Sequence, residues 1–372
     1  MTSGRVTAIA VDTSDATGNT VYVGGAEGGV WKTTNGGTNW SALTDAQFSL
    51  AIGSLAIDPN NNQVVYAGTG EENFNGDAYY GGGLLRSTDA GASWTQIGAS
   101  YFGGPLTSGL GGSYIGSVAI QPGAGAATPV LLVASEYSSS GQGFNSGIWR
   151  STDGGNTWSR VLLATSDTDS FGTSVFFVSN TTAYAAIGSI FGDSNNGVYK
   201  STNAGLTWVP ANGSGSTALT NGTNAGRITL VVAPSSSTTL NASIGSPTNV
   251  SSGLAGMFKS TDGGTTWNAI ATPLGTGGRG STNDFCGTQC WYDMPMVVSP
   301  SNPTLLYVAG SFNYSAGNGG IYMSTNGGAS WSSVNPGTLS SEGLHPDFHS
   351  IAFTAGGQKL YVGNDGGMWS TT

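Results

Sequence analysis

Ser151-Thr-Asp-Gly-Gly-Asn-Thr-Trp158 is one of six copies of an eight-residue pattern, here called the box, that recurs along the chain. The other five run over 33–40, 87–94, 201–208, 260–267 and 324–331, and a seventh is expected to begin at Ser370-Thr-Thr372. The spacings from one box tryptophan to the next are 54, 64, 50, 59 and 64 residues. The repeat unit therefore tolerates insertions, which we expect in loops between fixed strands.

Each repeat unit has the same order of elements around its box. An apolar first strand is expected at 6–11, 52–57, 115–120, 173–178, 228–233, 294–299 and 349–354, followed by a second strand, a third strand that opens on Gly, the box, and a short outer strand. Sheets of four such short strands cannot bury their faces alone, but stacking them radially does. The sequence predicts an all-β, seven-bladed β-propeller of four-stranded antiparallel blades, with the last blade incomplete.

The propeller is predicted to be a single domain over 1–372. Its blades are expected at approximately 5–44, 52–98, 115–163, 173–210, 227–271, 293–335 and 348–372. Only Met1 to Gly4 precede the first blade, which is too few to complete blade 7. We expect either a natural chain that continues past Thr372 or a three-stranded blade 7, completed by a neighbouring copy in an oligomer or filament.

The box itself has a structural interpretation. The Asp or Asn at its third position accepts hydrogen bonds from its own turn, its glycines allow positive φ, and its Trp packs between sheets. Its acids, Asp89, Asp153 and Asp262, are replaced by Asn at 35, 203 and 326. Because an amide cannot act as a general acid, the box acids are predicted to be structural.

The boxes resemble the Asp-box, or BNR, repeat Ser-x-Asp-x-Gly-x-x-Trp of sialidases, sortilin-type receptors, xyloglucan-cleaving glycosidases and photosystem II assembly propellers. The resemblance covers essentially the whole chain and implies the propeller fold. Enzymes and binding modules share it, so function must be argued from a site. The arginine triad that a sialidase needs is not apparent, because Arg86 and Arg150 occupy the repeating position before the box, while Arg5 and Arg227 open equivalent inner strands.

Composition excludes several functional classes. Charged residues make up 8% of the chain, against roughly 25% in an average globular domain. The net charge of −10 with only 10 Lys and Arg leaves no basic stripe for nucleic acid. No apolar run approaches the roughly 18 residues that cross a bilayer, and no export signal opens the chain.

Two carboxylates are candidates for catalysis. Glu27-Gly-Gly and Asp365-Gly-Gly occupy equivalent short turns of blades 1 and 7, on the face opposite the boxes, while blades 2 to 6 carry long loops there. This predicts a groove over blades 7 and 1 flanked by a pair of acids, as glycoside hydrolysis needs. The resemblance to xyloglucan-cleaving enzymes implies a catalytic Asp two residues before Gly-Gly, but Ala26 and Asn364 stand there. Turn chemistry alone also explains both acids.

The segment Glu71-Glu-Asn-Phe-Asn-Gly-Asp77 places side-chain oxygens at alternating positions, like the start of a calcium loop. Calcium on Glu71, Asn73, Asn75 and Asp77 is one interpretation, and a solvated acidic loop is the other, because Gly82 stands where the bidentate Glu belongs. Candidate ligand-binding residues here are Glu71, Glu72, Asp77, Tyr79 and Tyr80. The two tyrosines would stack on sugar rings or pack between blades.

Both histidines of the chain lie in His345-Pro-Asp-Phe-His349. If this segment is extended, His345, Asp347 and His349 project to one side and have the right chemistry for a divalent metal. The alternative is a turn into the first strand of blade 7.

Cys286 and Cys290 are four residues apart, which permits a small-loop disulfide. We expect the bond to stiffen a loop on the rim and to orient the neighbouring Trp291 and Tyr292. These two residues and Asp293 are further candidates for ligand binding.

Three functional hypotheses follow. The preferred one is a secreted or cell-surface, non-catalytic binding or scaffold module that recognises a glycan or an extracellular protein through its long-loop face. The alternatives are a glycoside hydrolase acting on a polysaccharide, and a self-assembling surface or filament subunit. No cofactor is required, calcium is an option, and low Lys content with a disulfide fits an extracellular setting.

Overall fold

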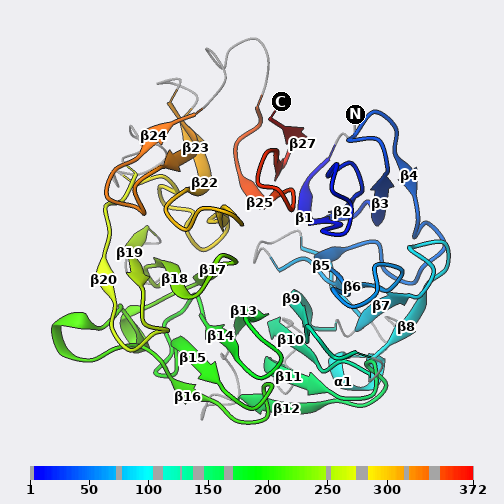
Figure 1. The fold of residues 1–372 in the computed structure, drawn as a ribbon, viewed down its shortest axis with the longest axis horizontal. Coiled ribbons are helices and arrows are strands. Elements are labelled where there is room, and N and C mark those ends of the chain that lie inside the picture. The colour runs from blue at the N-terminus through cyan, green and yellow to red at the C-terminus, as the bar shows by residue number, and fades with distance from the viewer. Residues whose placement is uncertain are drawn as a thin grey trace.

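The seven blades predicted from the boxes form a ring of sheets (Figure 1). The structure, a computed structural model, describes residues 4–72, 78–103, 112–125, 128–136, 146–162, 171–248, 253–273, 284–313, 318–334 and 344–371. Six sheets have four antiparallel strands, and the seventh has three. The prediction of a seven-bladed propeller with an incomplete last blade is confirmed.

The strands of blades 1 to 4 follow in chain order. Blade 1 contains β1 (Val6–Val11), β2 (Val21–Gly25), β3 (Val30–Thr33) and β4 (Ser41–Ala42), and blade 2 contains β5 (Ile52–Ile57), β6 (Val65–Thr69), β7 (Leu84–Ser87) and β8 (Thr95–Ile97). Blade 3 contains β9 (Tyr114–Ile120), β10 (Leu131–Glu136), β11 (Gly147–Ser151) and β12 (Ser159–Leu162), and blade 4 contains β13 (Gly172–Phe177), β14 (Ala183–Ile187), β15 (Gly197–Ser201) and β16 (Val209–Pro210).

Blades 5 to 7 complete the ring. Blade 5 contains β17 (Ile228–Ala233), β18 (Ser236–Gly245), β19 (Leu254–Ser260) and β20 (Asn268–Ala269), and blade 6 contains β21 (Met296–Val298), β22 (Leu306–Asn313), β23 (Asn318–Ser324) and β24 (Ser332–Ser333). Blade 7 contains β25 (Phe348–Phe353), β26 (Leu360–Asn364) and β27 (Gly367–Ser370).

Short helical segments lie between some blades: α1 (Ala99–Phe102), η2 (Gly215–Thr217) and η3 (Gly222–Asn224). None of the helices in the described part of the chain is long and apolar enough to cross a membrane.

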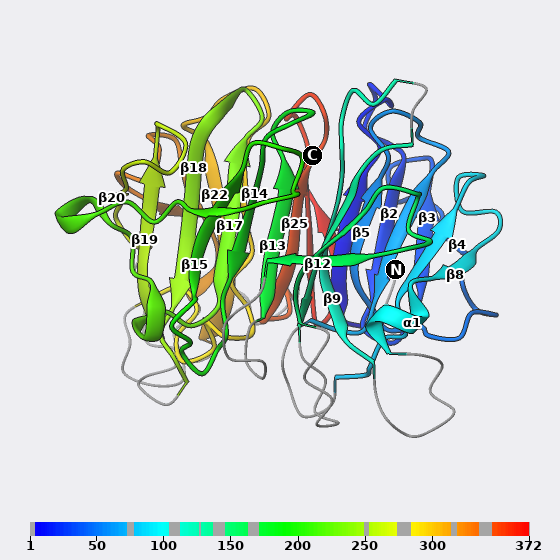
Figure 2. The same ribbon diagram turned by 90° about the horizontal axis from the view of Figure 1, so that it is seen from below.

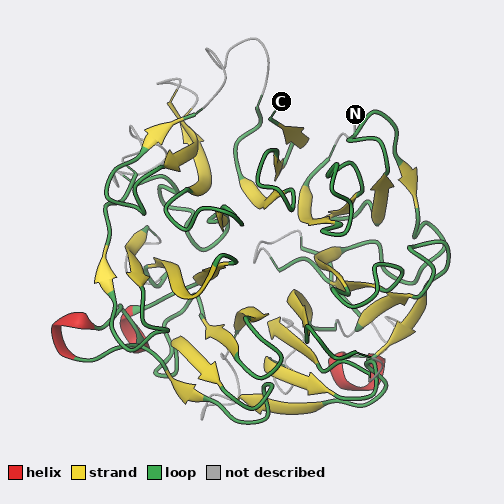
Figure 3. Cartoon of the chain, in the orientation of Figure 1, coloured by secondary structure: helices red, strands yellow, loops and turns green. Residues whose placement is uncertain are grey.

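Blade 7 packs directly against blade 1 and closes the ring, with the two ends of the chain close to this junction (Figure 1). The Ser350 hydroxyl donates to the Val6 carbonyl at 3.3 Å, and the Tyr361 hydroxyl donates to the Gly18 carbonyl at 3.1 Å. The inner strands of the blades run roughly parallel to the ring axis, whereas the outer strand β12 lies across it (Figure 2). Strands make up nearly all of the regular structure (Figure 3). Because successive strands are antiparallel, first strands begin and second strands end on the same face, where the candidate residues were predicted.

The box geometry explains why Asp and Asn alternate in it. In blade 3, Asp153 Oδ1 accepts from the Ser151 hydroxyl at 2.8 Å and from the Thr157 amide at 2.9 Å. In blade 4, Asn203 Oδ1 accepts the two equivalent bonds, both at 2.9 Å. An amide oxygen therefore holds the turn as a carboxylate does.

Substitutions at Asp153 test whether its side-chain oxygen stabilises the box turn. Asp153→Asn is expected to unfold within about 0.5 kcal/mol of the parent at pH 7, whereas Asp153→Ala is expected to lose about 1–2 kcal/mol with its hydrogen bonds. The Thr157 bonds lower the pKa of Asp153 to about 2, so its ionic contribution is present above pH 4 and is lost as pH falls toward 2. Urea unfolding at pH 7 and pH 3 measures both effects. Equal losses in the two variants would contradict the role of the oxygen.

The register of blade 7 corrects one expectation. Tyr361 pairs with Ser370 in the way that Tyr22 pairs with Lys32, the residue before the first box. The seventh box therefore begins at Thr371, one residue later than predicted. Ser370 takes the position that Lys32 fills in blade 1, and Lys359 supplies the cation instead, 5.4 Å from the centroid of the Tyr361 ring.

Candidate functional site: the axial charge cluster

Charged side chains from six blades gather where the first strands begin and the second strands end. We call them the axial charge cluster: Arg5, Glu71, Glu72, Glu136, Arg227, Asp293, Asp347, His349 and Asp365. Arg5 and Arg227 directly precede β1 and β17, Glu136 ends β10, and Asp365 directly follows β26. Ring closure thus brings together residues that are far apart in sequence.

Arg5 joins three blades of the ring. Its Nη1 lies 2.5 Å from Glu71 Oε1, its Nε lies 3.3 Å from Asp365 Oδ1, and its guanidinium lies 5.9 Å from the centroid of the Tyr292 ring. Burial alone would lower the pKa of Arg5, but the hydrogen bond and charge of Glu71 raise it above the ordinary value. Since Glu71 is only 1% exposed, Arg5 is its required counter-charge.

His349 holds Asp365 from the other side. The distance between His349 Nε2 and Asp365 Oδ1 is 2.6 Å, and the Tyr292 ring packs edge-on against the imidazole at 4.7 Å between centroids. Burial lowers the pKa of His349, although Asp365 opposes the shift. The lowered pKa favours a neutral imidazole that donates from Nε2 to Asp365, and the Arg5 guanidinium forms an ion pair with the same carboxylate.

Arg227 faces two buried carboxyl groups. Its Nη2 lies 2.9 Å from Glu72 Oε1, and a Cβ at Gly116 of β9 would overlap Glu72, so glycine is required beneath this side chain. Burial raises the pKa of Glu72, and Arg227 partly offsets the shift. Burial and the charge of Glu72 raise the pKa of Glu136 well above its usual range. One cation faces two acids here, which favours the protonated form of one of them.

A second group of acids lies beside His345. Asp293 is fully buried, and burial together with the neighbouring Asp347 raises its pKa well above the usual range. Burial and Asp365 raise the pKa of Asp347, which also adopts a left-handed φ of 65°. Ligand atoms of His345, Asp347 and Asp365 all lie within 4.8 Å of one another. This set suits a divalent cation, with Asp365 in place of the predicted His349, and metal binding here stays a prediction.

The structure separates the other predicted ligand residues into buried and exposed ones. Tyr292 and Asp293 are buried, as are Glu71 and Glu72, and Tyr80 stacks on Tyr114 at 5.5 Å between ring centroids. Tyr79 is 57% exposed. Asn73, Asn75 and Asp77 lie outside the described residues. Arg5 binds Glu71 Oε1, and calcium on this loop stays a prediction.

Sequence reasoning missed two features of this face. Phe191, in the loop after β14, is 44% exposed and packs edge-on against Phe171. Glu136 joins the cluster from the end of β10. Arg5 and Arg227 stand at equivalent positions before two inner strands, and this equivalence could have indicated a shared site. The sequence analysis attributed both arginines only to the repeat.

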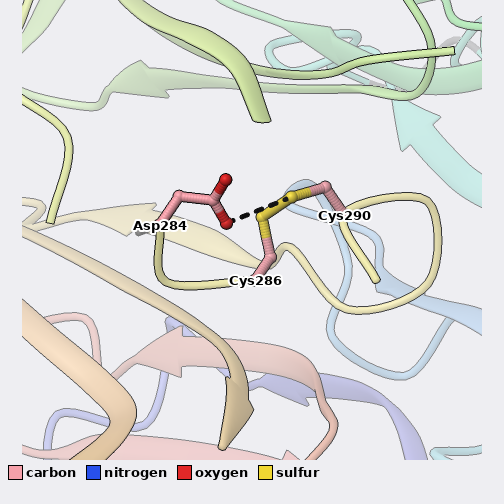
Figure 4. A group of neighbouring side chains, drawn as sticks. All are labelled: Asp284, Cys286 and Cys290. Atoms are coloured by element: carbon pink, nitrogen blue, oxygen red, sulfur yellow. Dashed lines mark hydrogen bonds between the residues drawn. A yellow bond between two sulfur atoms is a disulfide. The ribbon is translucent and has the colours of Figure 1, made fainter. Parts of the chain in front are cut away.

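The predicted disulfide between Cys286 and Cys290 is present (Figure 4). Both cysteines are fully buried against Met257 and Phe285, so the bond fixes a segment packed between blades 5 and 6 rather than a rim loop as predicted. Cys290 Sγ lies 3.8 Å from Asp284 Oδ1 (Figure 4). Because both sulfurs are oxidised, this group offers no thiolate to a metal.

A groove of about 790 Å³ runs along the face of blade 1 that is turned toward blade 7. Its described lining includes Arg5, Glu27, Trp31 and Trp40. Glu27 is exposed, whereas Asp365 is not among the lining residues and is held by Arg5 and His349. The two candidate catalytic acids therefore have different surroundings.

Comparisons with known proteins agree with the fold. No protein-family model matches the sequence. A xyloglucanase of Hypocrea jecorina is 28% identical over 250 residues, which cover 65% of this chain and 23% of that protein. A GH74 enzyme structure from Niastella koreensis matches with a TM-score of 0.65 at 22% identity over 99% of this chain and 52% of the other.

A single-propeller structure matches as well. The structure described as YCF48 bound to D1 peptide has a TM-score of 0.56 at 15% identity, covering 99% of this chain and 93% of the other. The chain thus spans about half the length of the GH74 enzyme and nearly all of the YCF48 structure. The chain is a seven-bladed β-propeller, similar in fold to half of a GH74 enzyme and to the YCF48 propeller.

Proposed function

We propose that this propeller is a non-catalytic binding module, extracellular or at the cell surface, that recognises a polysaccharide on the face of the axial charge cluster. The observation that carries the proposal is the exposure of two aromatic rings there, Tyr79 and Phe191, at 57% and 44%. Aromatic faces stack on sugar rings, and large exposed apolar side chains on a polar loop face are typical of binding sites.

The fixed charges of the cluster support a neutral polyhydroxyl ligand. Arg5, His349 and Asp365 hold one another in place, so donors and acceptors are oriented before a ligand arrives. Sugar hydroxyls both donate and accept hydrogen bonds, which suits a fixed arrangement of donors and acceptors. The relationship to xyloglucanases favours a glycan over a protein ligand, and the peptide-bound YCF48 structure keeps a protein ligand as an outcome of the test.

Hydrolysis is less well supported than binding. A glycosidase needs one carboxyl group that carries a proton and a second group poised at the sugar. Asp365 forms an ion pair with Arg5 and a hydrogen bond with His349, and Glu27 lies exposed in the groove of blade 1. Ala26 and Asn364 occupy the positions at which the xyloglucan-cleaving family carries its catalytic Asp. We therefore propose recognition without bond cleavage.

Affinity electrophoresis tests the proposed polysaccharide binding. Separate gels contain xyloglucan, mixed-linkage β-glucan, arabinoxylan and mannan. Tyr79→Ala and Phe191→Ala are each expected to weaken the retarded complex about tenfold, which corresponds to about 1.4 kcal/mol per stacked ring. Leu206→Ala is the matched control, because Leu206 is 56% exposed in the box of blade 4 on the opposite face.

Loss of retardation in the two aromatic variants alone supports the proposal. Equal retardation of parent, Tyr79→Ala and Phe191→Ala would contradict it. Absence of any polysaccharide binding, with a protein ligand captured by the same two rings, would also contradict the glycan assignment.

A further inference from the structure

Asp293 is a fully buried carboxyl group that receives no hydrogen bond. Its side chain is 0% exposed, and neither Oδ1 nor Oδ2 has a hydrogen-bond partner among the described residues. The charged groups next to it are acids, because the Asp347 carboxyl is in contact with it and Asp365 lies close enough to raise its pKa further. A buried carboxylate without a partner is costly, so these touching carboxyl groups need either a shared proton or a bound cation.

The acids beside Asp293 already belong to a set of side chains that can surround a metal ion. Ligand atoms of His345, Asp347 and Asp365 lie within 4.8 Å of one another. Ligand atoms around a tetrahedral zinc ion are about 3.4 Å apart, since each lies about 2.1 Å from the metal. The set therefore needs only a small closure to hold an ion, and Asp293 adds a fourth donor group beside it.

His345 is oriented as metal-binding histidines are. Its Nδ1 lies 3.0 Å from the Pro346 carbonyl oxygen, which can only accept, so Nδ1 carries the proton and Nε2 keeps its lone pair. A histidine that binds a metal through one ring nitrogen usually donates the other N–H to a carbonyl or a carboxylate. The Asn364 side-chain amide donates to the His345 carbonyl at 2.7 Å, and a Cβ at Gly366 would overlap the His345 Cβ. Glycine at 366 therefore keeps the room that the His345 side chain occupies.

His349 fits the outer part of the same site. Its Nε2 lies 2.6 Å from Asp365 Oδ1, and Arg5 Nε approaches the same oxygen at 3.3 Å. Both contacts use Oδ1, so Oδ2 of this carboxylate remains as a donor atom for an ion. Carboxylates that bind metals are themselves commonly hydrogen-bonded, and this second contact fixes their orientation. His349 is thus a positioning residue rather than the metal ligand predicted from the sequence.

The charges of these side chains also favour a cation. Arg5 lies 2.5 Å from Glu71 and 3.3 Å from Asp365, so Glu71 offsets its charge at closer range. The carboxyl groups of Asp293, Asp347 and Asp365 then share one small volume beside a neutral imidazole. A divalent cation relieves the repulsion between these carboxyl groups.

We propose that this set binds one divalent cation of the zinc type, with His345, Asp347, Asp365 and Asp293 as its ligands. An imidazole nitrogen together with carboxylate oxygens suits Zn²⁺ better than Ca²⁺ or Mg²⁺, which prefer oxygen alone. Asp293 precedes β21, whereas Asp347 and Asp365 flank the open end of the β25–β26 hairpin, so the ion ties blade 6 to blade 7. His345 is exposed, and water therefore reaches the ion from that side. This inference does not rest on the polysaccharide proposal.

Isothermal titration of the untagged chain with ZnCl₂, after removal of metals with EDTA, tests the site. The parent is expected to bind one Zn²⁺ and to bind Ca²⁺ at least about tenfold more weakly. His345→Ala and Asp347→Asn are each expected to lower the Zn²⁺ affinity at least about tenfold. Asparagine tolerates the left-handed φ of 65° at position 347, so this change preserves the backbone. Asp45→Asn, a change of an exposed acid in the turn after β4, is the matched control and is expected to bind Zn²⁺ as the parent does.

Nuclear magnetic resonance of the imidazole rings provides a second readout, because the chain contains only two histidines. Zn²⁺ is expected to shift the His345 ring signals in the parent and in Asp45→Asn, and not in Asp347→Asn at the same concentration. Equal Zn²⁺ affinity of the parent, His345→Ala and Asp347→Asn would overturn the proposal. Tighter binding of Ca²⁺ than of Zn²⁺, or His345 ring signals that do not respond to Zn²⁺, would overturn it as well.

Discussion

Replacing Arg5 by Met is expected to destabilise the propeller by about 3–5 kcal/mol, because it leaves buried carboxylate charge without its counter-charge. Glu71 is 1% exposed and lies 2.5 Å from the guanidinium, and Asp365 loses its ion pair with Arg5 in the same change. Arg5 also lies at the boundary of blades 7 and 1, so the ring is weakened where it closes.

Urea unfolding at pH 7 measures this effect, and a double variant isolates its cause. Adding Glu71→Gln to Arg5→Met removes the orphaned charge and is expected to restore about half of the loss. The control is Arg160→Met on β12, where Arg160 lies 5.9 Å from the centroid of the Trp149 ring and the change is expected to cost about 1 kcal/mol. A loss below about 1 kcal/mol in Arg5→Met would contradict the role of the pair.

Replacing Glu136 by Gln is expected to do the opposite and to stabilise the fold at pH 8 by about 1–4 kcal/mol. Burial and the charge of Glu72 raise the pKa of Glu136 above its unfolded value of 4.5. The folded state therefore binds the proton more tightly than the unfolded state, and stability falls as pH rises from about 4.5 toward the raised pKa. Glutamine carries no charge, so this decline is removed.

Thermal unfolding from pH 5 to pH 8 measures how the stability of the fold declines as pH rises. Glu72→Gln is the comparison variant, because it removes the carboxylate that lies 2.9 Å from Arg227 Nη2 and leaves Glu136 as the remaining acid of the pair. A Glu136→Gln variant that melts below the parent at pH 8, or that keeps the parent's slope, would show that the pair of acids shares no proton.

The blades could be predicted from the sequence because each depends on local signals. Every box carries its own Ser or Thr, its Asp or Asn and its Trp within eight residues, and the Ser or Thr hydroxyl donates to the Asp or Asn. The prediction that the seventh box begins at Ser370 was wrong because it, too, relied on local signals. Ser370-Thr371 looks like the start of a box, and only the pairing of Tyr361 with Ser370 shows that the box begins one residue later.

The axial charge cluster could not be predicted in the same way, because its contacts cross blades. Arg5 and Glu71 are 66 residues apart, and their meeting depends on where two strands end at the ring axis. Asp365 was recognised as an acid, but its contact with Arg5 comes from ring closure and its contact with His349 from the pairing of β25 with β26. Phe191 and Glu136 lie in segments without a motif, so no local signal distinguished them.

Reducing-end release from the most tightly bound polysaccharide of the panel is the measurement that tests the central claim most directly. The purified chain is incubated at saturating binding, beside Glu27→Gln and Asp365→Asn variants. Binding without any release above the protein-free blank, in parent and variants alike, is the result expected for a recognition module. Steady release by the parent that is lost in Glu27→Gln or Asp365→Asn would show instead that the propeller is a glycoside hydrolase.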